Sequence, residues 1–179
     1  MAHLSYSFLR KAACIAAAAL LLACSPKYDW REVRSPDANF QALFPGKPSS
    51  HSRAINLDGI QVTMTMTAAD VDGASFAVGS ATLADAAQAA AALTAMKTAM
   101  IRNMGGTVRH DKTVSSAGAP AMTEVEIAGP SPSTASDTRL MVARFIVKDR
   151  RVYQIVVVGQ EKNIPREQID TFFTSFKPG

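Results

Sequence analysis

Residues 139–147 constrain the fold most, because nearly every position in this stretch is apolar. A strand with one solvated face alternates apolar and polar residues, whereas a strand buried on both faces is a continuous apolar run. Here the run is interrupted after its first residue only by Arg144. We therefore expect a strand in the interior of a sheet, with a further layer of structure against each of its faces.

The remaining apolar residues mostly follow the period of two that is typical of strands. Residues 51–57 and 60–68 flank Asp58-Gly59, a dipeptide that favours the positive φ angles of a two-residue hairpin turn. Asp72-Gly73 repeats this arrangement before a strand at 75–82. The pattern predicts an antiparallel meander, with further strands at 40–44, 107–115, 121–128, 138–148 and 152–159.

Two segments have helical periodicity instead. In residues 84–104 the apolar side chains recur at steps of three and four, Thr82 and Asp85 can cap the start, and Gly105 can end the helix. A second helix with one apolar face is predicted at about 165–176. The fold class that follows is α+β, one domain with an antiparallel sheet of about six to seven strands flanked by two long helices.

The first 23 residues have the three zones of an export signal. A cationic start at Arg10 and Lys11 is followed by an apolar stretch over 12–22 and by the small residue Ala23. Eleven apolar residues are too few for a membrane-spanning helix, which needs about 20. We therefore expect residues 1–23 to be removed after export.

Leu21-Leu22-Ala23-Cys24 resembles the lipobox of bacterial lipoproteins, in which the cysteine is alkylated with a diacylglyceryl group before cleavage. The alternative is an ordinary secretory signal that happens to contain a cysteine. The resemblance implies cleavage between Ala23 and Cys24, and two or three acyl chains on Cys24 that hold the chain at a membrane. Because Ser25 rather than Asp follows, it implies the outer membrane, facing the periplasm. Residues 24–28 would then be a short tether to a domain over 29–179.

Removal of the signal also changes the composition. Without Arg10 and Lys11, 17 lysines and arginines face 15 aspartates and glutamates, which gives little support for nucleic-acid binding. Cys14 would leave with the signal and Cys24 would be alkylated, so no thiol would remain for a disulfide, a zinc site or a nucleophile.

Few residues suggest catalysis or metal binding. Histidine is the usual base at neutral pH, and we interpret His51 and His110 as surface residues. There is no Gly-x-Ser-x-Gly elbow and no glycine-rich phosphate loop. Asp70-Val71-Asp72-Gly73 resembles the start of a calcium loop, but the glycine comes too early and no glutamate follows at the required spacing, which favours a hairpin corner. We predict no enzyme and no cofactor beyond the covalent lipid.

The methionines suggest one alternative function, a site for a metal ion that prefers sulfur ligands. Met96, Met100 and Met104 align on one face of the predicted helix, and thioether sulfur can bind Cu(I). The apolar face of an amphipathic helix is also where core residues belong, and methionine fills irregular cores well. Core packing is the favoured interpretation.

One internal charge predicts an ion pair. Arg144 interrupts the apolar strand, while Glu124 and Glu126 lie on a single face of the preceding strand. A cross-strand pair would satisfy a charge that is costly to bury alone.

Three stretches together are similar to the PsbP-like group, including the DcrB-like lipoproteins of bacteria. They are Trp30 followed by 40–48, then 151–158, then 172–176. The resemblance implies an α/β/α sandwich and an accessory or binding role, with no catalytic residue to transfer. The leading hypothesis is thus an envelope lipoprotein that binds a protein partner close to its membrane. The alternative is a periplasmic lipoprotein that binds a small molecule or Cu(I), and an enzyme comes third.

Overall fold

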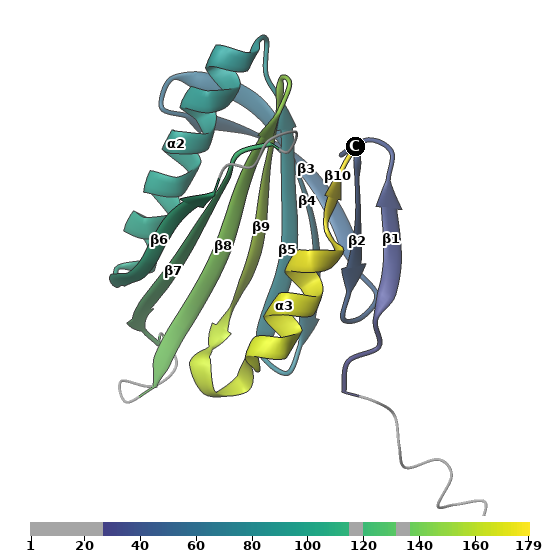
Figure 1. Ribbon diagram of the computed structural model, residues 1–179, viewed down its shortest axis with the longest axis vertical. Coiled ribbons are helices and arrows are strands. Elements are labelled where there is room, and N and C mark those ends of the chain that lie inside the picture. Colours follow the sequence, from purple (N-terminus) through teal and green to yellow (C-terminus); the bar gives the residue numbers. More distant parts are fainter. Residues whose placement is uncertain (1–26, 115–119, 132–136) are drawn as a thin grey trace, which may run out of the picture.

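The computed structural model describes residues 27–114, 120–131 and 137–179 and contains two antiparallel sheets and two α-helices (Figure 1). Strands account for 56% of the described residues and helices for 22%. No helix among the described residues is long and apolar enough to cross a bilayer. The two helices pack on opposite faces of the larger sheet (Figure 1).

The larger sheet has seven strands in the order β3-β4-β5-β9-β8-β7-β6. Its strands are β3 (Ser49–Leu57), β4 (Ile60–Val71), β5 (Ala74–Thr82), β6 (Thr107–Val114), β7 (Met122–Pro130), β8 (Thr138–Lys148) and β9 (Arg151–Gln160). Asp58 and Gly59 have φ angles of 53° and 91°, and Asp72 and Gly73 have 52° and 73°. Both predicted hairpin turns are confirmed, because the chain reverses at these left-handed pairs.

β8 has the interior position that its apolar sequence predicted. It lies between β9 and β7, and its side chains alternate between two cores. Leu140 and Val142 belong to the core under α3 (Arg166–Ser175). Met141 and Ala143 belong to the core under α2 (Ala86–Met104). Burial on both faces explains the loss of the usual alternation in this strand.

The C-terminal cap of α2 is the residue that the sequence predicted, whereas the N-terminal cap differs from the prediction. Gly105, with φ 59°, ends the helix as predicted. At the start, the Asp85 side chain accepts a hydrogen bond of 2.8 Å from the backbone N–H of Gln88, so Asp85 itself is the N-cap. The predicted role of Thr82 as the capping residue is wrong, since Thr82 ends β5.

The predicted single sheet flanked by two long helices, an α/β/α sandwich, is also wrong. A second sheet, in the order β1-β2-β10, consists of β1 (Arg31–Ser35), β2 (Phe40–Phe44) and β10 (Lys177–Pro178). It shares one face of the larger sheet with α3, which is preceded by the short 3₁₀ helix η1 (Glu161–Asn163). With ten residues, α3 spans only about 15 Å, whereas seven strands span about 29 Å. The small sheet covers the part of this face of the larger sheet that α3 does not reach.

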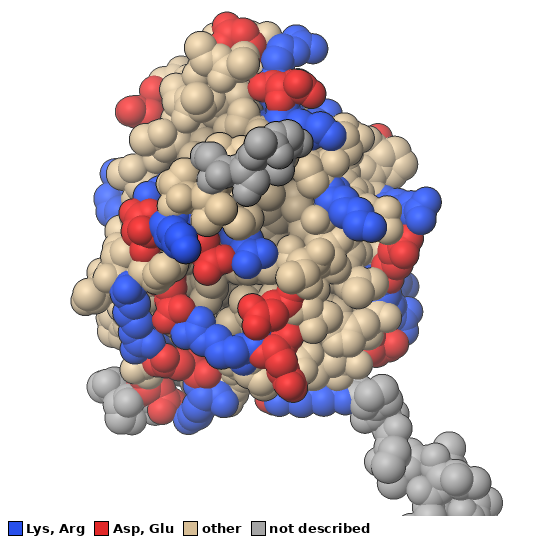
Figure 2. Space-filling view, viewed as in Figure 1, with Lys and Arg blue, Asp and Glu red and all other residues tan. Residues whose placement is uncertain are grey.

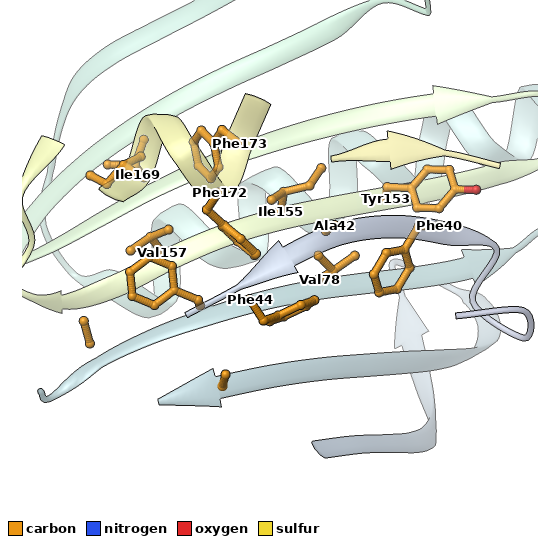
Figure 3. Close-up of a cluster of buried hydrophobic side chains, with 14 of the residues drawn as sticks. Phe40, Ala42, Phe44, Val78, Tyr153, Ile155, Val157, Ile169, Phe172 and Phe173 are labelled. Carbon is orange, nitrogen blue, oxygen red and sulfur yellow. The ribbon is translucent and has the colours of Figure 1, made fainter. Parts of the chain in front are cut away.

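An aromatic cluster joins the small sheet and α3 to the larger sheet. Phe172 packs edge-on against Phe44 and Phe76, with ring centroids 5.3 and 5.5 Å apart. Figure 3 shows the aromatic side chains of β2 and α3 converging on Val78 and Ile155. The Tyr153 hydroxyl donates a 2.7 Å hydrogen bond to the Asn39 carbonyl, and burial raises the pKa of this hydroxyl.

Candidate functional site

The expected cleavage and lipidation residues, Ala23 and Cys24, lie outside the described residues, as do residues 25 and 26 of the expected tether. The described chain begins at Lys27, within the stretch predicted to be tether. The contacts of the next few residues therefore decide how closely the N-terminal segment is held to the domain.

The segment Lys27–Trp30 is docked on the domain. Lys27 forms an ion pair with Asp72, which raises the pKa of the lysine. Tyr28 stacks on Trp30 at 6.1 Å, and both rings contact Phe76 edge-on at 6.3 and 6.2 Å. The contacts of the described chain thus begin at Lys27, within the range 24–28 that was predicted as a tether.

The N-terminal segment leaves the domain at one particular end of the larger sheet. Asp72 lies in the turn between β4 and β5, and η1 lies at the same end (Figure 1). We call this end, which carries Asp72-Gly73 and η1, the β4–β5 end. The turns at Asp58-Gly59 and Asp149-Arg150 lie at the opposite end (Figure 1).

A cavity of about 640 Å³ opens at the β4–β5 end, and we call it the β4–β5 cavity. Its lining includes charged side chains of both signs. It is lined by Asp70, Asp72, Gly73, Ser75, Ser131, Arg139, Val158, Gly159, Gln160 and Asn163. Asp72, which pairs with Lys27, is part of this lining, so the N-terminal segment starts at the cavity rim.

The two aspartates of the suspected calcium loop sit in this wall without converging on a shared site. Asp70 accepts a 2.5 Å hydrogen bond from the Ser75 hydroxyl, while Asp72 pairs with Lys27. The segment forms a hairpin corner, with Asp72 and Gly73 at positive φ. Among the described residues there is no group of three or more histidines, cysteines, aspartates or glutamates that could hold a metal ion.

The strand-to-strand ion pair predicted for Arg144 has one of its two expected partners. Arg144 Nε donates to Glu124 Oε2 at 2.6 Å, directly across from β8 to β7. The Arg144 guanidinium also lies 4.6 Å from the ring centroid of Phe173 on α3. Arg144 is thereby held between a carboxylate and an aromatic ring, which satisfies a charge that is about four-fifths buried.

Glu126 binds other arginines instead. Its carboxylate accepts two hydrogen bonds from Arg166 of α3, at 2.6 and 2.8 Å, and lies 3.8 Å from Arg109 of β6. The Arg166 hydrogen bonds are the main reason that the pKa of Glu126 falls below its usual value. The alternation of side chains along the strands could not identify Arg166 as a partner of Glu126, because Arg166 lies on a helix that follows later in the chain.

The two histidines among the described residues are exposed, His51 on β3 and His110 on β6. Around α3 and β6–β8, positive and negative side chains are interleaved, with no large area of one sign on the face shown (Figure 2). On this face, the charged side chains therefore do not form the extended basic field that is typical of nucleic-acid-binding surfaces.

The methionines of α2 pack in the core. Met96 and Met104 are 3% and 8% exposed, and Met100 packs at the margin of the same cluster. Met66 is engaged through its sulfur, which accepts a 3.3 Å hydrogen bond from Gln154 Nε2. Burial among aliphatic side chains favours the packing interpretation over a Cu(I) site at Met96, Met100 and Met104.

The β4–β5 cavity and the docked N-terminal segment are the features that the sequence missed. Arg139 was visible only as the first residue of an apolar strand, and Asp72 only as part of a turn. Comparison of the chain with models of known protein families finds no match, and comparison with curated proteins finds no similar chain.

Proposed function

We propose that this chain is a bacterial envelope lipoprotein, anchored by acyl chains on Cys24, that serves as an accessory or binding protein at a membrane surface. The pattern Leu21-Leu22-Ala23-Cys24 after an apolar stretch supports the anchor. The observation that carries the proposal is the docking of Lys27 on Asp72, which leaves only residues 25 and 26 between the anchor and the domain.

This spacing predicts how the domain sits at the membrane. Three Cα-to-Cα steps separate Cys24 from Lys27, and each spans at most about 3.8 Å. The Cα atom of Lys27, whose side chain reaches Asp72 at the β4–β5 end, would therefore lie within about 11 Å of the Cα atom of the anchored residue. A partner would bind close to the membrane surface, or to the end that projects away from it.

A binding role rather than catalysis agrees with the surface of the domain. The ion pairs of Glu124 and Glu126 join elements of the fold to one another, as structural salt bridges do. We therefore propose membrane anchoring, partner binding and an outer-membrane location together.

The mass of the mature N-terminus tests the anchor. We expect a chain that begins at Cys24 and carries two or three acyl groups, and a Cys24→Ala variant that keeps its signal or leaves the membrane fraction. Ser25→Ala is the matched control and should be lipidated normally. A mature wild-type chain without lipid, soluble in the periplasm, would contradict the proposal.

Cross-linking of the lipidated protein in cells tests the accessory role. One stoichiometric envelope partner is the expected result, recovered with wild-type protein and lost with Cys24→Ala. Recovery of the lipoprotein with no partner attached would count against this part of the proposal.

A further inference from the structure

Arg139, in the wall of the β4–β5 cavity, is a partly buried cation that has no side-chain partner in the described part of the chain. The described residues include five partly buried lysines and arginines: Lys97, Arg139, Arg144, Lys148 and Arg151. Four of them donate to a described carboxylate, carbonyl or hydroxyl group. Arg139 makes no side-chain hydrogen bond or ion pair with any described residue. The Arg139 nitrogens are not buried away from solvent, so they are open to the cavity, and an anion bound there could accept charge-assisted hydrogen bonds from them.

The same cavity also carries negative charge. Asp70 and Asp72 belong to its lining, and among the described side chains the Asp70 carboxylate pairs with Ser75 and the Asp72 carboxylate with Lys27. A carboxylate has about four acceptor positions, so both aspartates can accept further hydrogen bonds from a ligand. The cavity therefore presents one unpaired guanidinium and two carboxylates to whatever enters it.

We propose that the β4–β5 cavity binds a phosphoethanolamine headgroup, with the phosphate on Arg139 and the ammonium on Asp70 and Asp72. A purely anionic group would meet the two carboxylates, and a purely cationic group would meet the guanidinium. A zwitterion with a phosphate and a primary ammonium matches both charges. The cavity volume of about 640 Å³ lies within the usual range for small-ligand sites, about 300–1,000 Å³.

The position of the cavity points to membrane lipid as the source of the headgroup. This step rests on the proposed lipid anchor, because Lys27 pairs with Asp72 at the cavity rim and Cys24 precedes Lys27 by three residues. The anchor would hold the cavity at headgroup level. Lipid bound there would restrain the β4–β5 end against the surface of its own membrane.

Calorimetric titration tests the chemistry of the cavity. The full mature protein, lipidated and held in a detergent without phosphate, would be titrated with glycerophosphoethanolamine, glycerophosphocholine, glycerophosphoglycerol and inorganic phosphate. We expect saturable binding that is tightest for glycerophosphoethanolamine, since choline lacks N–H donors and the other two probes lack a cation. Arg139→Gln should weaken this binding at least about tenfold. Arg53→Gln, which removes an exposed arginine from β3, should leave it unchanged.

A second variant tests the carboxylate wall. Asp70→Asn keeps the size of the side chain but removes its charge, so the preference for glycerophosphoethanolamine over glycerophosphoglycerol should shrink. Equal binding of these two probes by the wild type would overturn the zwitterionic ligand. Unchanged binding by Arg139→Gln would overturn the site.

Vesicles distinguish lipid from a soluble ligand. With the protein anchored in phosphatidylethanolamine vesicles, amide exchange at residues 70–75 and 157–160 should be slower than in phosphatidylcholine vesicles, and this difference should vanish in Arg139→Gln. Headgroup binding in solution without this difference would overturn lipid as the source and leave a soluble zwitterion. Arg139→Gln should retain its acyl groups by mass, so a failed cavity is distinguishable from a failed anchor.

Discussion

At the scale of single residues, Glu126 has the least exposed side chain of the ion-paired residues in the described part of the domain. It connects β7 to α3 through Arg166 and lies close to Arg109 of β6. Its side chain is only 14% exposed, so solvent screens these interactions weakly. We therefore expect this carboxylate to matter more for stability than the exposed ion pairs.

The first prediction concerns Glu126→Gln. At neutral pH the free energy of unfolding of the variant should be about 1–3 kcal/mol lower than that of the wild type, because a charged acceptor of two hydrogen bonds is lost. The pKa of Glu126 is lowered in the folded state, so its contribution is present above the unfolded-state pKa and is lost as the pH falls through the folded-state pKa. Urea unfolding at several pH values measures this.

The difference between wild type and Glu126→Gln should accordingly shrink in acid. Glu167→Gln is a suitable control, since Glu167 is exposed on α3 and, among the described residues, its carboxylate accepts a hydrogen bond only from its neighbour Gln168. A loss of stability that does not depend on pH would contradict the electrostatic explanation.

The second prediction concerns the pair of Arg144 and Glu124. In a double-mutant cycle of Arg144→Gln and Glu124→Gln, the coupling free energy should be about 1 kcal/mol, because both side chains are largely removed from solvent. Arg144→Lys should recover only part of the loss, since an ammonium group stacks less well than a guanidinium on Phe173. Additive single-variant effects would show that the pair is not coupled.

At the scale of elements, the end of α2 offers a comparison between two adjacent glycines. Gly105 has φ 59° and open space where a Cβ would be, whereas a Cβ on Gly106 would lie 2.1 Å from the Ala128 carbonyl oxygen. Gly105→Ala should cost about 1 kcal/mol through backbone strain alone. Gly106→Ala should lower the free energy of unfolding by about 3 kcal/mol, because the backbone that follows α2 must move away from β7.

Thermal unfolding of these two glycine variants checks the difference. The larger loss at Gly106 should be accompanied by faster amide exchange in β7, while Gly105→Ala should affect only the last turn of α2. Equal losses at both positions would contradict the packing argument.

The element scale also shows where sequence reasoning succeeds. Turns at Asp58-Gly59 and Asp72-Gly73, the C-terminal glycine of α2 and the interior position of β8 were all predictable, because each depends on local backbone preference or on the burial of consecutive residues. The assignment of β1 and β2 to a separate sheet was not predictable. A short strand with alternating apolar residues looks the same whether it extends a sheet or packs across its face.

At the scale of the whole molecule, the docked N-terminal segment predicts an orientation. If Cys24 is acylated, the β4–β5 end should face the bilayer, and the turn at Asp149-Arg150 should stand away from it by roughly the length of β8. Eleven residues of strand correspond to about 36 Å.

Single cysteines labelled with a fluorophore measure this orientation. Lys162→Cys, in η1, should be quenched strongly by spin-labelled lipid headgroups, and Arg150→Cys, in the β8–β9 turn, should be quenched weakly. Acylation of Cys24 would leave no other free thiol in the mature chain. Equal quenching at both positions would contradict the orientation.

The sequence by itself determined the two helices, the two hairpin turns and the strands other than β1 and β10, because these follow from local periodicity and backbone preference. It also supplied the lipobox-like segment on which the proposed anchor depends. The sequence also suggested Glu124 as a partner of Arg144, but only the tertiary structure decided the partners of most other charged side chains. Lys27 meets Asp72, Glu126 meets Arg166, and Arg139 lies in a cavity without a side-chain partner among the described residues. The physical reason is that these contacts join residues distant in the chain, and their geometry depends on how sheets and helices pack rather than on spacing along the sequence.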